Sequence, residues 1–154
     1  MRPIKFDVHL PALGFNHART FAQLAESLGF YSVSFGDHFF MNMTLSRAVA
    51  PSPTTPKLEC YTTLAALAAL TNRVRLLTNV TPMGFRTPAL LAKMSSTLDV
   101  ISGGRLIMGL GTGWLRQEFD ACGIDFPDKP RAHRAPGGRS SDPEVDVDAS
   151  AHQF

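Results

Sequence analysis

The chain repeats one pattern, a strand followed by a helix, and this repeat leaves few folds open to it. Segments with strand character begin near positions 4, 31, 74 and 105, and helical periodicity separates each from the next. This spacing suits parallel strands, because two parallel strands need a crossover of a dozen or more residues. The pattern predicts an α/β fold of about four βα units, either an open doubly wound sheet or part of a (β/α)8 barrel.

The first unit shows both periodicities. Apolar residues alternate with polar ones over residues 4–10, which predicts a strand with one buried face. From Ala18 the apolar residues recur at helical spacing, and the buried face that they predict consists of Phe21, Leu24, Ala25 and Leu28. Gly29 follows at once, which is typical of a helix that ends in a left-handed conformation.

The later units have similar signals. Strands are predicted at residues 31–35, 74–80 and 105–109, with a helix at 59–70. A third helix begins at Pro88 after a Thr87 cap and ends at Gly103 and Gly104. Its predicted buried face consists of Leu90, Leu91, Met94, Leu98 and Ile101. The last strand is apolar throughout, which predicts that both of its faces are covered.

Composition narrows the classes of function. The chain has 154 residues, of which 44% are hydrophobic and 18% charged, as in ordinary soluble domains. A net charge of +2 from scattered arginines argues against a nucleic acid partner. The longest apolar helical run, residues 64–70, is too short to span a bilayer, so we expect no membrane association.

The two cysteines, Cys60 and Cys122, are far apart and lack the spacing of metal ligands. We therefore expect no metal site, two small core residues, and a reducing, cytoplasmic environment.

Composition changes after Arg134. Residues 135–154 have almost no apolar periodicity and are rich in proline, glycine, serine and aspartate, which predicts a disordered tail. The expected organisation is one domain over residues 1–134 and a tail over 135–154.

Three segments are expected at the carboxyl ends of the strands, residues 36–38, 79–81 and 109–114. Parallel strands place these ends on one rim, where both of the candidate architectures bind ligands. We therefore expect a ligand site there.

Alternating glycines mark the last of these segments, GLGTGW at residues 109–114. The spacing fits neither a dinucleotide fingerprint nor a phosphate-binding P-loop. Two interpretations remain open: a flat ring or a phosphate lies against main chain that lacks a Cβ atom, or a tight turn requires glycine.

Other polar residues are weaker candidates. Asp37 and His38 are adjacent in a strand and therefore need not touch. Glu118 either has a chemical role or lies in the first turn of a helix, and the helix is the better interpretation. Asp99 and Arg105 are expected to form a surface ion pair.

Several segments together resemble the N-terminal half of the luciferase-like monooxygenase superfamily. The similarity covers residues 4–134 and includes SFGDHF, LECYTTLAALAALTNRVRLLTNVTP, FRTPALLAKMSSTLDVISGGRLIMGLGTGW and EFDACGIDFP. The resemblance implies a (β/α)8 TIM-barrel fold, of which this chain holds about half, as a truncated luciferase-like domain.

The resemblance also implies a function and a site. It implies a flavin- or deazaflavin-dependent oxidoreductase or monooxygenase that uses coenzyme F-420 or FMN on a small organic substrate. It makes His38 the catalytic residue, with Trp114 and Met41 in the substrate pocket. The residues that it places at the cofactor are Asp37, Asn79, Val80, Gly111, Thr112 and Gly113. It further predicts a cis peptide bond between Asn79 and Val80.

Some alternatives stay open at this point. Trp114 stands where sugar-phosphate dehydrogenases of the deazaflavin branch carry an acid, which argues against that substrate. A half barrel would expose sheet edges, so a homodimer, a half-barrel assembly subunit or a non-catalytic remnant are alternatives. An open-sheet enzyme that binds a phosphate ligand and no flavin is a further alternative.

Overall fold

A parallel sheet forms the centre of the structure. The computed structural model describes residues 3–40 and 57–127. The sheet has the strand order β1, β2, β3, β5 and every neighbouring pair is parallel. Its strands are β1 (Asp7–His9), β2 (Ser32–Phe35), β3 (Arg75–Thr78) and β5 (Leu106–Ile107). A second parallel pair, β4 (Thr81–Pro82) and β6 (Leu110–Gly111), continues the chain just beyond β3 and β5.

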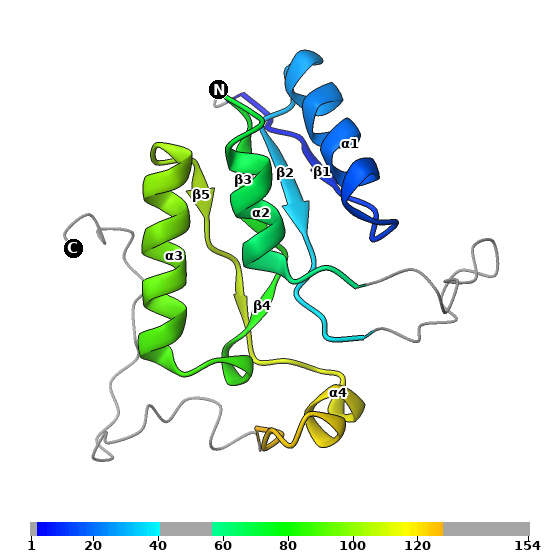
Figure 1. Cartoon of the computed structure of the whole chain (residues 1–154), viewed down its shortest axis with the longest axis vertical. Helices are drawn as coiled ribbons and strands as arrows, with labels where there is room; N and C mark the ends of the chain where they lie inside the picture. Colours follow the sequence, from blue (N-terminus) through cyan, green and yellow to red (C-terminus); the bar gives the residue numbers. More distant parts are fainter. Residues whose placement is uncertain (1–2, 41–56, 128–154) are drawn as a thin grey trace.

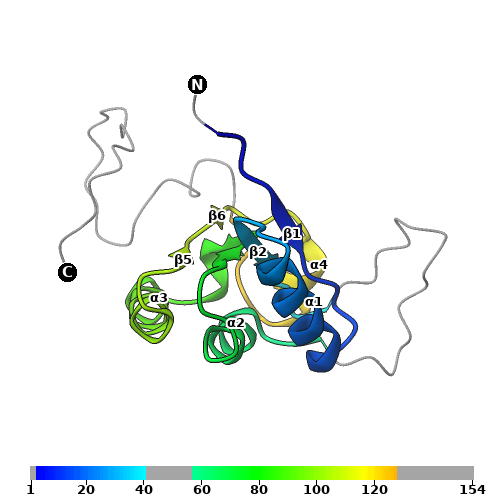
Figure 2. The same cartoon turned by 90° about the horizontal axis from the view of Figure 1, so that it is seen from above.

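The three long helices lie side by side against one face of this sheet (Figures 1 and 2). They are α1 (Phe15–Ser27), α2 (Cys60–Ala68) and α3 (Pro88–Ser102). A 3-10 turn, η1 (Met83–Phe85), precedes α3, and a short helix, α4 (Arg116–Ala121), follows β6. A doubly wound sheet carries helices on both faces, whereas barrel strands carry them only outside. Sequential strand order with helices on one face therefore confirms the barrel alternative.

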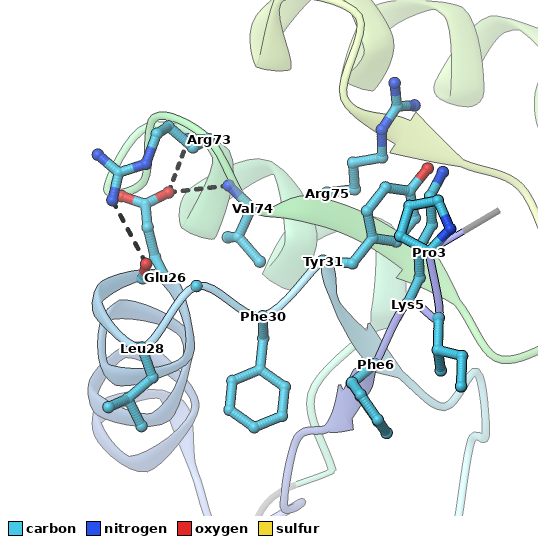
Figure 3. A pocket seen from close by; sticks show the side chains of 12 residues that line it. Pro3, Lys5, Phe6, Glu26, Leu28, Phe30, Tyr31, Arg73, Val74 and Arg75 are labelled. Carbon is cyan, nitrogen blue, oxygen red and sulfur yellow. Dashed lines mark hydrogen bonds between the residues drawn. The ribbon is translucent and has the colours of Figure 1, made fainter. Parts of the chain in front are cut away.

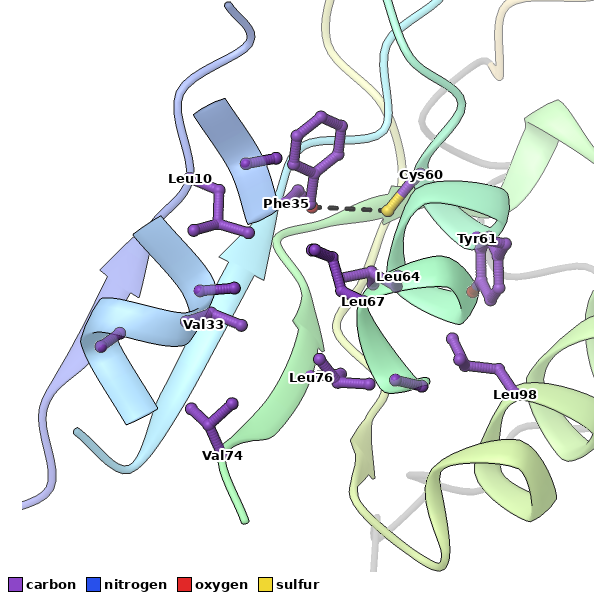
Figure 4. Packing of buried hydrophobic residues seen from close by; sticks show 14 of the residues in the cluster. Leu10, Val33, Phe35, Cys60, Tyr61, Leu64, Leu67, Val74, Leu76 and Leu98 are labelled. Atoms are coloured by element: carbon purple, nitrogen blue, oxygen red, sulfur yellow. Dashed lines mark hydrogen bonds between the residues drawn. The ribbon is translucent and has the colours of Figure 1, made fainter. Parts of the chain in front are cut away.

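The hydrophobic core lies between the sheet and the helices (Figure 4). Val33 of β2 and Leu76 of β3 face Leu64 and Leu67 of α2, and all four side chains are fully buried. Cys60, at the first turn of α2, directs its thiol toward the Phe35 carbonyl oxygen. Burial raises the pKa of the Cys60 thiol, so this sulfur stays protonated and serves as a small core residue.

The predicted helix ends are confirmed. Gly29 and Gly103 both have positive φ angles, 79° and 67°, as a left-handed helix end requires. Thr87 accepts a hydrogen bond from the Leu90 backbone N–H, and Pro88 occupies the first helical position.

The predicted buried face of α1 is wrong except at Ala25. Ala18, Ala22 and Ala25 are buried, while Phe21 and Leu24 are exposed, as is Leu28 just after the helix. Small alanine side chains let the helix approach the sheet closely. The larger side chains of Phe21, Leu24 and Leu28 stay outside this contact.

Three other burial predictions are partly wrong. On α3, Leu91 and Leu98 are buried, but Leu90 and Ile101 are exposed. At the first strand, Ile4 and Phe6 are exposed and lie before β1. The last strand, predicted to be covered on both faces, is only half-buried.

The predicted ion pair between Asp99 and Arg105 is also wrong. Asp99 accepts a hydrogen bond from the Leu106 backbone N–H. The Arg105 guanidinium donates to the carbonyl oxygens of Ala68, Thr71, Val74 and Ser102. Arg105 therefore ties the turn after α2 to the turn after α3.

The remaining expectations concern Cys122, membrane spans, metal sites, Met41 and the tail. Cys122 is exposed, so the prediction that it lies in the core is wrong. Among the described residues no helix is long and apolar enough to cross a membrane, and no group of three metal-ligating side chains forms. Met41 and the predicted tail, residues 135–154, lie outside the described residues.

Candidate functional site

The three predicted segments do meet at the carboxyl ends of the parallel strands (Figure 1). Thr78, the last residue of β3, joins two of them. Its hydroxyl donates to the Gly109 carbonyl oxygen at 2.9 Å and accepts from the Gly109 N–H at 2.9 Å. The Asn79 N–H donates to the Phe35 carbonyl oxygen at 2.9 Å, which brings in the end of β2.

Two of the alternating glycines are required by the protein's own neighbouring strand. A Cβ atom at Gly109 would collide with the Thr78 carbonyl oxygen, and one at Gly111 would lie 2.8 Å from Val80 Cγ2. Val80 thus packs against glycine backbone on one side. The sequence left two explanations for these glycines, a tight turn or a bound ligand. The structure adds a third, the close approach of residues 78–80 to the glycine backbone.

Gly113 is a glycine for a different reason. Its φ angle is 86°, and a Cβ atom there would lie 2.6 Å from the Phe119 ring. Phe119 of α4 is fully buried, so a turn and a packing contact together require glycine at this position.

The peptide bond between Asn79 and Val80 is cis, as the resemblance predicts. The bond lies between β3 and β4. Val80 is 44% exposed, so the side that does not touch Gly111 is open at the rim.

His38 is held by a buried carboxylate. Its Nδ1 atom lies 2.7 Å from Glu118 Oε2, and Glu118 is only 1% exposed. The other Glu118 oxygen accepts the Phe40 backbone N–H at 3.0 Å. Glu118 does lie in the first turn of α4, as predicted, but its second role could not be read from the sequence. Because an ionised carboxylate only accepts hydrogen bonds, Nδ1 of His38 carries the hydrogen and Nε2 is left for a ligand.

Asp37 points elsewhere and has its own partner. Arg86, from the loop before α3, donates to both Asp37 oxygens at 2.6 and 3.0 Å and to Glu59 Oε1 at 2.6 Å. Burial by itself would lower the pKa of Arg86, but the hydrogen bonds that Arg86 donates to Asp37 and Glu59, together with the charges of these carboxylates, outweigh it and the pKa is raised. Glu59 also accepts the Tyr61 and Thr62 backbone N–H groups at the start of α2. The ion pairs therefore fasten three loops together at this end of the sheet.

A small cavity opens at the same end of the barrel. Its volume is about 110 Å³, and its polar lining residues are His9, His38, Lys57 and Asn79. Trp114, which is 60% exposed, stands beside it with its ring edge-on to His38 at 6.2 Å between centroids.

A larger hollow of about 580 Å³ lies at the opposite, amino end of the strands (Figure 3). Phe6, Phe30, Tyr31 and Arg75 line it, and none of the predicted site residues is among its lining residues. Barrel enzymes bind their substrates at the carboxyl end, so the smaller cavity is the better candidate despite its size.

Three residues of this region were not predicted to be site residues. Arg86 and Glu118 act through partners 49 and 80 positions away in sequence. No residue next to His9 in the sequence indicates a site there, although His9 lies near the end of a predicted strand. For Glu118 the sequence held one signal of a place in the site: an acidic residue on a predicted helix that directly follows the glycine segment.

Comparison with known proteins agrees with this geometry. The family described as "Luciferase-like monooxygenase" matches residues 2–134. A pyrimidine monooxygenase RutA from Enterobacter sp. (strain 638) is 43% identical over 67 residues, covering 44% of this chain and 18% of that protein.

Solved structures with the same architecture extend the comparison. Monooxygenase RslO1 from Streptomyces bottropensis is 32% identical, with a TM-score of 0.63 over 79% of this chain and 37% of its own. The coenzyme F-420 dependent tetrahydromethanopterin reductase from Methanopyrus kandleri is 27% identical, with a TM-score of 0.64 over 81% of this chain and 31% of its own. These relatives are TIM barrels. The chain spans well under half the length of each of these three relatives.

Proposed function

Because the chain belongs to the luciferase-like monooxygenase family, we propose that it forms the part of a flavin or deazaflavin enzyme that holds the cofactor ring. The cofactor is FMN or coenzyme F-420, and the ring lies across the carboxyl ends of the strands. The observation that carries the proposal is the meeting of His38, the Asn79–Val80 segment and the glycine segment on one rim.

The residues present fit such a ring. Val80 offers an open apolar surface backed by Gly111, which is a suitable platform for a flat aromatic group. Asn79, Val80, Gly111, Thr112 and Gly113 would hold the ring. Trp114 would wall the substrate side. Met41, outside the described residues, is assigned to the pocket on the resemblance alone.

Asp37 has a positioning role in this proposal. Both of its oxygens accept hydrogen bonds from Arg86, so its carboxylate fixes the loop that begins with His38. Contact between Asp37 and the cofactor, which the resemblance implies, would then involve its main chain.

His38 would act as the acid or base. When bound, the cofactor supplies the redox chemistry, and the protein supplies position and exclusion of water. With Nδ1–H held by Glu118, the Nε2 atom of His38 can accept a proton from the substrate or donate one to a substrate oxygen. The buried Glu118 carboxylate stabilises the imidazolium that forms. The substrate is a small organic molecule, and the two free thiols suit a cytoplasmic location.

A second candidate function is that of a half-barrel subunit. Leu77 of β3 and Ile107 of β5 alternate with Leu76 and Leu106, which pack in the core, so they lie on the sheet face not covered by helices, and both are half-buried. A second polypeptide, or a second copy of this chain, would cover them and complete the site.

Cofactor titration tests the leading proposal. FMN and coenzyme F-420 are added separately to the full chain while their fluorescence is followed, and we expect micromolar binding of one of them. Val80→Asp should weaken that binding about tenfold or more, because a carboxylate under the ring loses its water. Val100→Asp is the matched control, since Val100 is 81% exposed on α3. Failure of both cofactors to bind, or equal effects of the two substitutions, would contradict the proposal.

A further inference from the structure

His9 shares the rim cavity with His38. It is the last residue of β1, and its ring lines the cavity. A Cβ atom at Gly36 would lie 3.9 Å from His9 Cε1 and 3.7 Å from His38 Cδ2. Two imidazoles from neighbouring strands therefore flank the same glycine.

A chain of hydrogen bonds sets the protonation of His9. The Ser34 hydroxyl donates to Asp7 Oδ2 at 2.6 Å. The Ser34 Oγ atom also lies 3.1 Å from His9 Nδ1. A hydroxyl has one hydrogen to donate, and Asp7 receives it. Ser34 can therefore only accept from His9, so Nδ1 of His9 carries the hydrogen.

The remaining ring nitrogen is then an acceptor. In neutral imidazole one nitrogen donates and the other accepts, so Nε2 of His9 offers a lone pair on an exposed ring. Ser34 is fully buried, which holds this arrangement in place. Lys57 and Asn79, which line the same cavity, bring donor groups.

We propose that His9 receives a hydrogen bond from an O–H or N–H group of the substrate, and so selects ligands that carry a donor beside an acceptor. The role in substrate selection rests on the proposed function, since it assumes that the rim is the active site. The pairing differs from that of His38, because His38 is fixed by a carboxylate on α4 and His9 by a serine within the sheet.

The tautomer of His9 is the first test. Long-range ¹H–¹⁵N spectra of the full chain at alkaline pH, where imidazoles are neutral, report which nitrogen carries the hydrogen. We expect His9 to be protonated at Nδ1, and we expect Ser34→Ala to abolish this preference. Ser32→Ala is the matched control, because Ser32 donates to the other Asp7 oxygen at 2.7 Å without touching His9. Protonation of His9 at Nε2 in the unaltered chain would overturn the proposal.

Ligand discrimination is the second test. Succinimide carries an N–H group between two carbonyls, and N-methylsuccinimide lacks that hydrogen. We expect succinimide to bind about two- to tenfold more tightly, the worth of one neutral hydrogen bond, and Ser34→Ala to reduce this ratio while Ser32→Ala leaves it unchanged. Equal affinities, or binding of neither probe, would overturn the proposal.

Parallel titration with FMN and coenzyme F-420 separates the two proposals. If the tautomer and the discrimination hold while neither cofactor binds, the proposed function fails and the polar subsite stands. If a cofactor binds but His9 is protonated at Nε2, only the subsite fails.

Discussion

Single residues at the rim depend on partners that are distant in sequence. Glu118 is the clearest case, because one buried carboxylate accepts hydrogen bonds from both the His38 ring and the Phe40 backbone N–H. Removing a partner from a buried polar pair leaves the other group unsatisfied, which costs more than the bond itself contributes. Glu118 therefore supports the fold and the orientation of His38 together.

Glu118→Gln tests this double role. A glutamine can accept only one of the two hydrogen bonds and has no charge, so we expect the free energy of unfolding in urea to fall by about 1–3 kcal/mol. Asp120→Asn is the control, because Asp120 is exposed on the same helix. Equal stability changes for the two variants would show that the contacts of Glu118 contribute little.

At the level of elements, local signals in the sequence predicted where helices begin and end. Gly29, Thr87 and Gly103 act within their own turns, so their roles were visible without knowledge of the fold. Burial faces were harder to predict, since burial depends on which neighbours an element meets. Ala22 is buried and Phe21 exposed because α1 packs closely on one side and has no described neighbour on the other.

The location of the site could be predicted from the sequence, but the contacts within it could not. Parallel strands bring His38, Asn79 and Gly109 to one rim, which follows from topology alone. The pairing of His38 with Glu118 and of Asp37 with Arg86 depends on how loops 80 and 49 residues away return to the rim. No local pattern encodes such contacts.

Glu26 links two elements, and its removal should change how stability depends on pH. Its carboxylate accepts the backbone N–H groups of Asn72, Arg73 and Val74, so α1 is fastened to the turn before β3. Figure 3 shows the bonds that involve Arg73 and Val74. Burial raises the pKa of Glu26, but the bonds from these three backbone groups outweigh it and the pKa is lowered from 4.5.

A carboxyl group with a lowered pKa stabilises the folded state above its unfolded pKa, and this stabilisation is lost as pH falls through the folded value. We therefore expect the melting temperature to decline below about pH 4.5 in the unaltered chain and to decline less in Glu26→Gln. Thermal unfolding followed by circular dichroism at several pH values measures both slopes. Parallel slopes for the two proteins would contradict the assignment.

At the scale of the whole molecule, the described part of the chain leaves one sheet face without a layer of helices. Half-buried apolar residues on such a face, here Leu77 and Ile107, and open edges at β1 and β5 favour association. This property follows from the arrangement of elements and not from any single residue.

Self-association through this face is therefore expected. Sedimentation velocity should show dimers or larger species at micromolar concentrations, and Ile107→Glu, on the face opposite Leu106, should shift the distribution toward monomer. Ala66→Glu adds the same charge on the exposed side of α2 and serves as the control. A chain that stays monomeric, or a control with the same effect, would contradict association through the sheet face.

The location of the cofactor decides between the two ends of the half barrel. Amide chemical shifts of the full chain are recorded while FMN or coenzyme F-420 is added. Binding at the rim should move the signals of Asn79, Val80 and Thr112 and leave those of Tyr31 and Arg75 unchanged. Shifts confined to the Tyr31 and Arg75 end, or no shifts with either cofactor, would contradict the account.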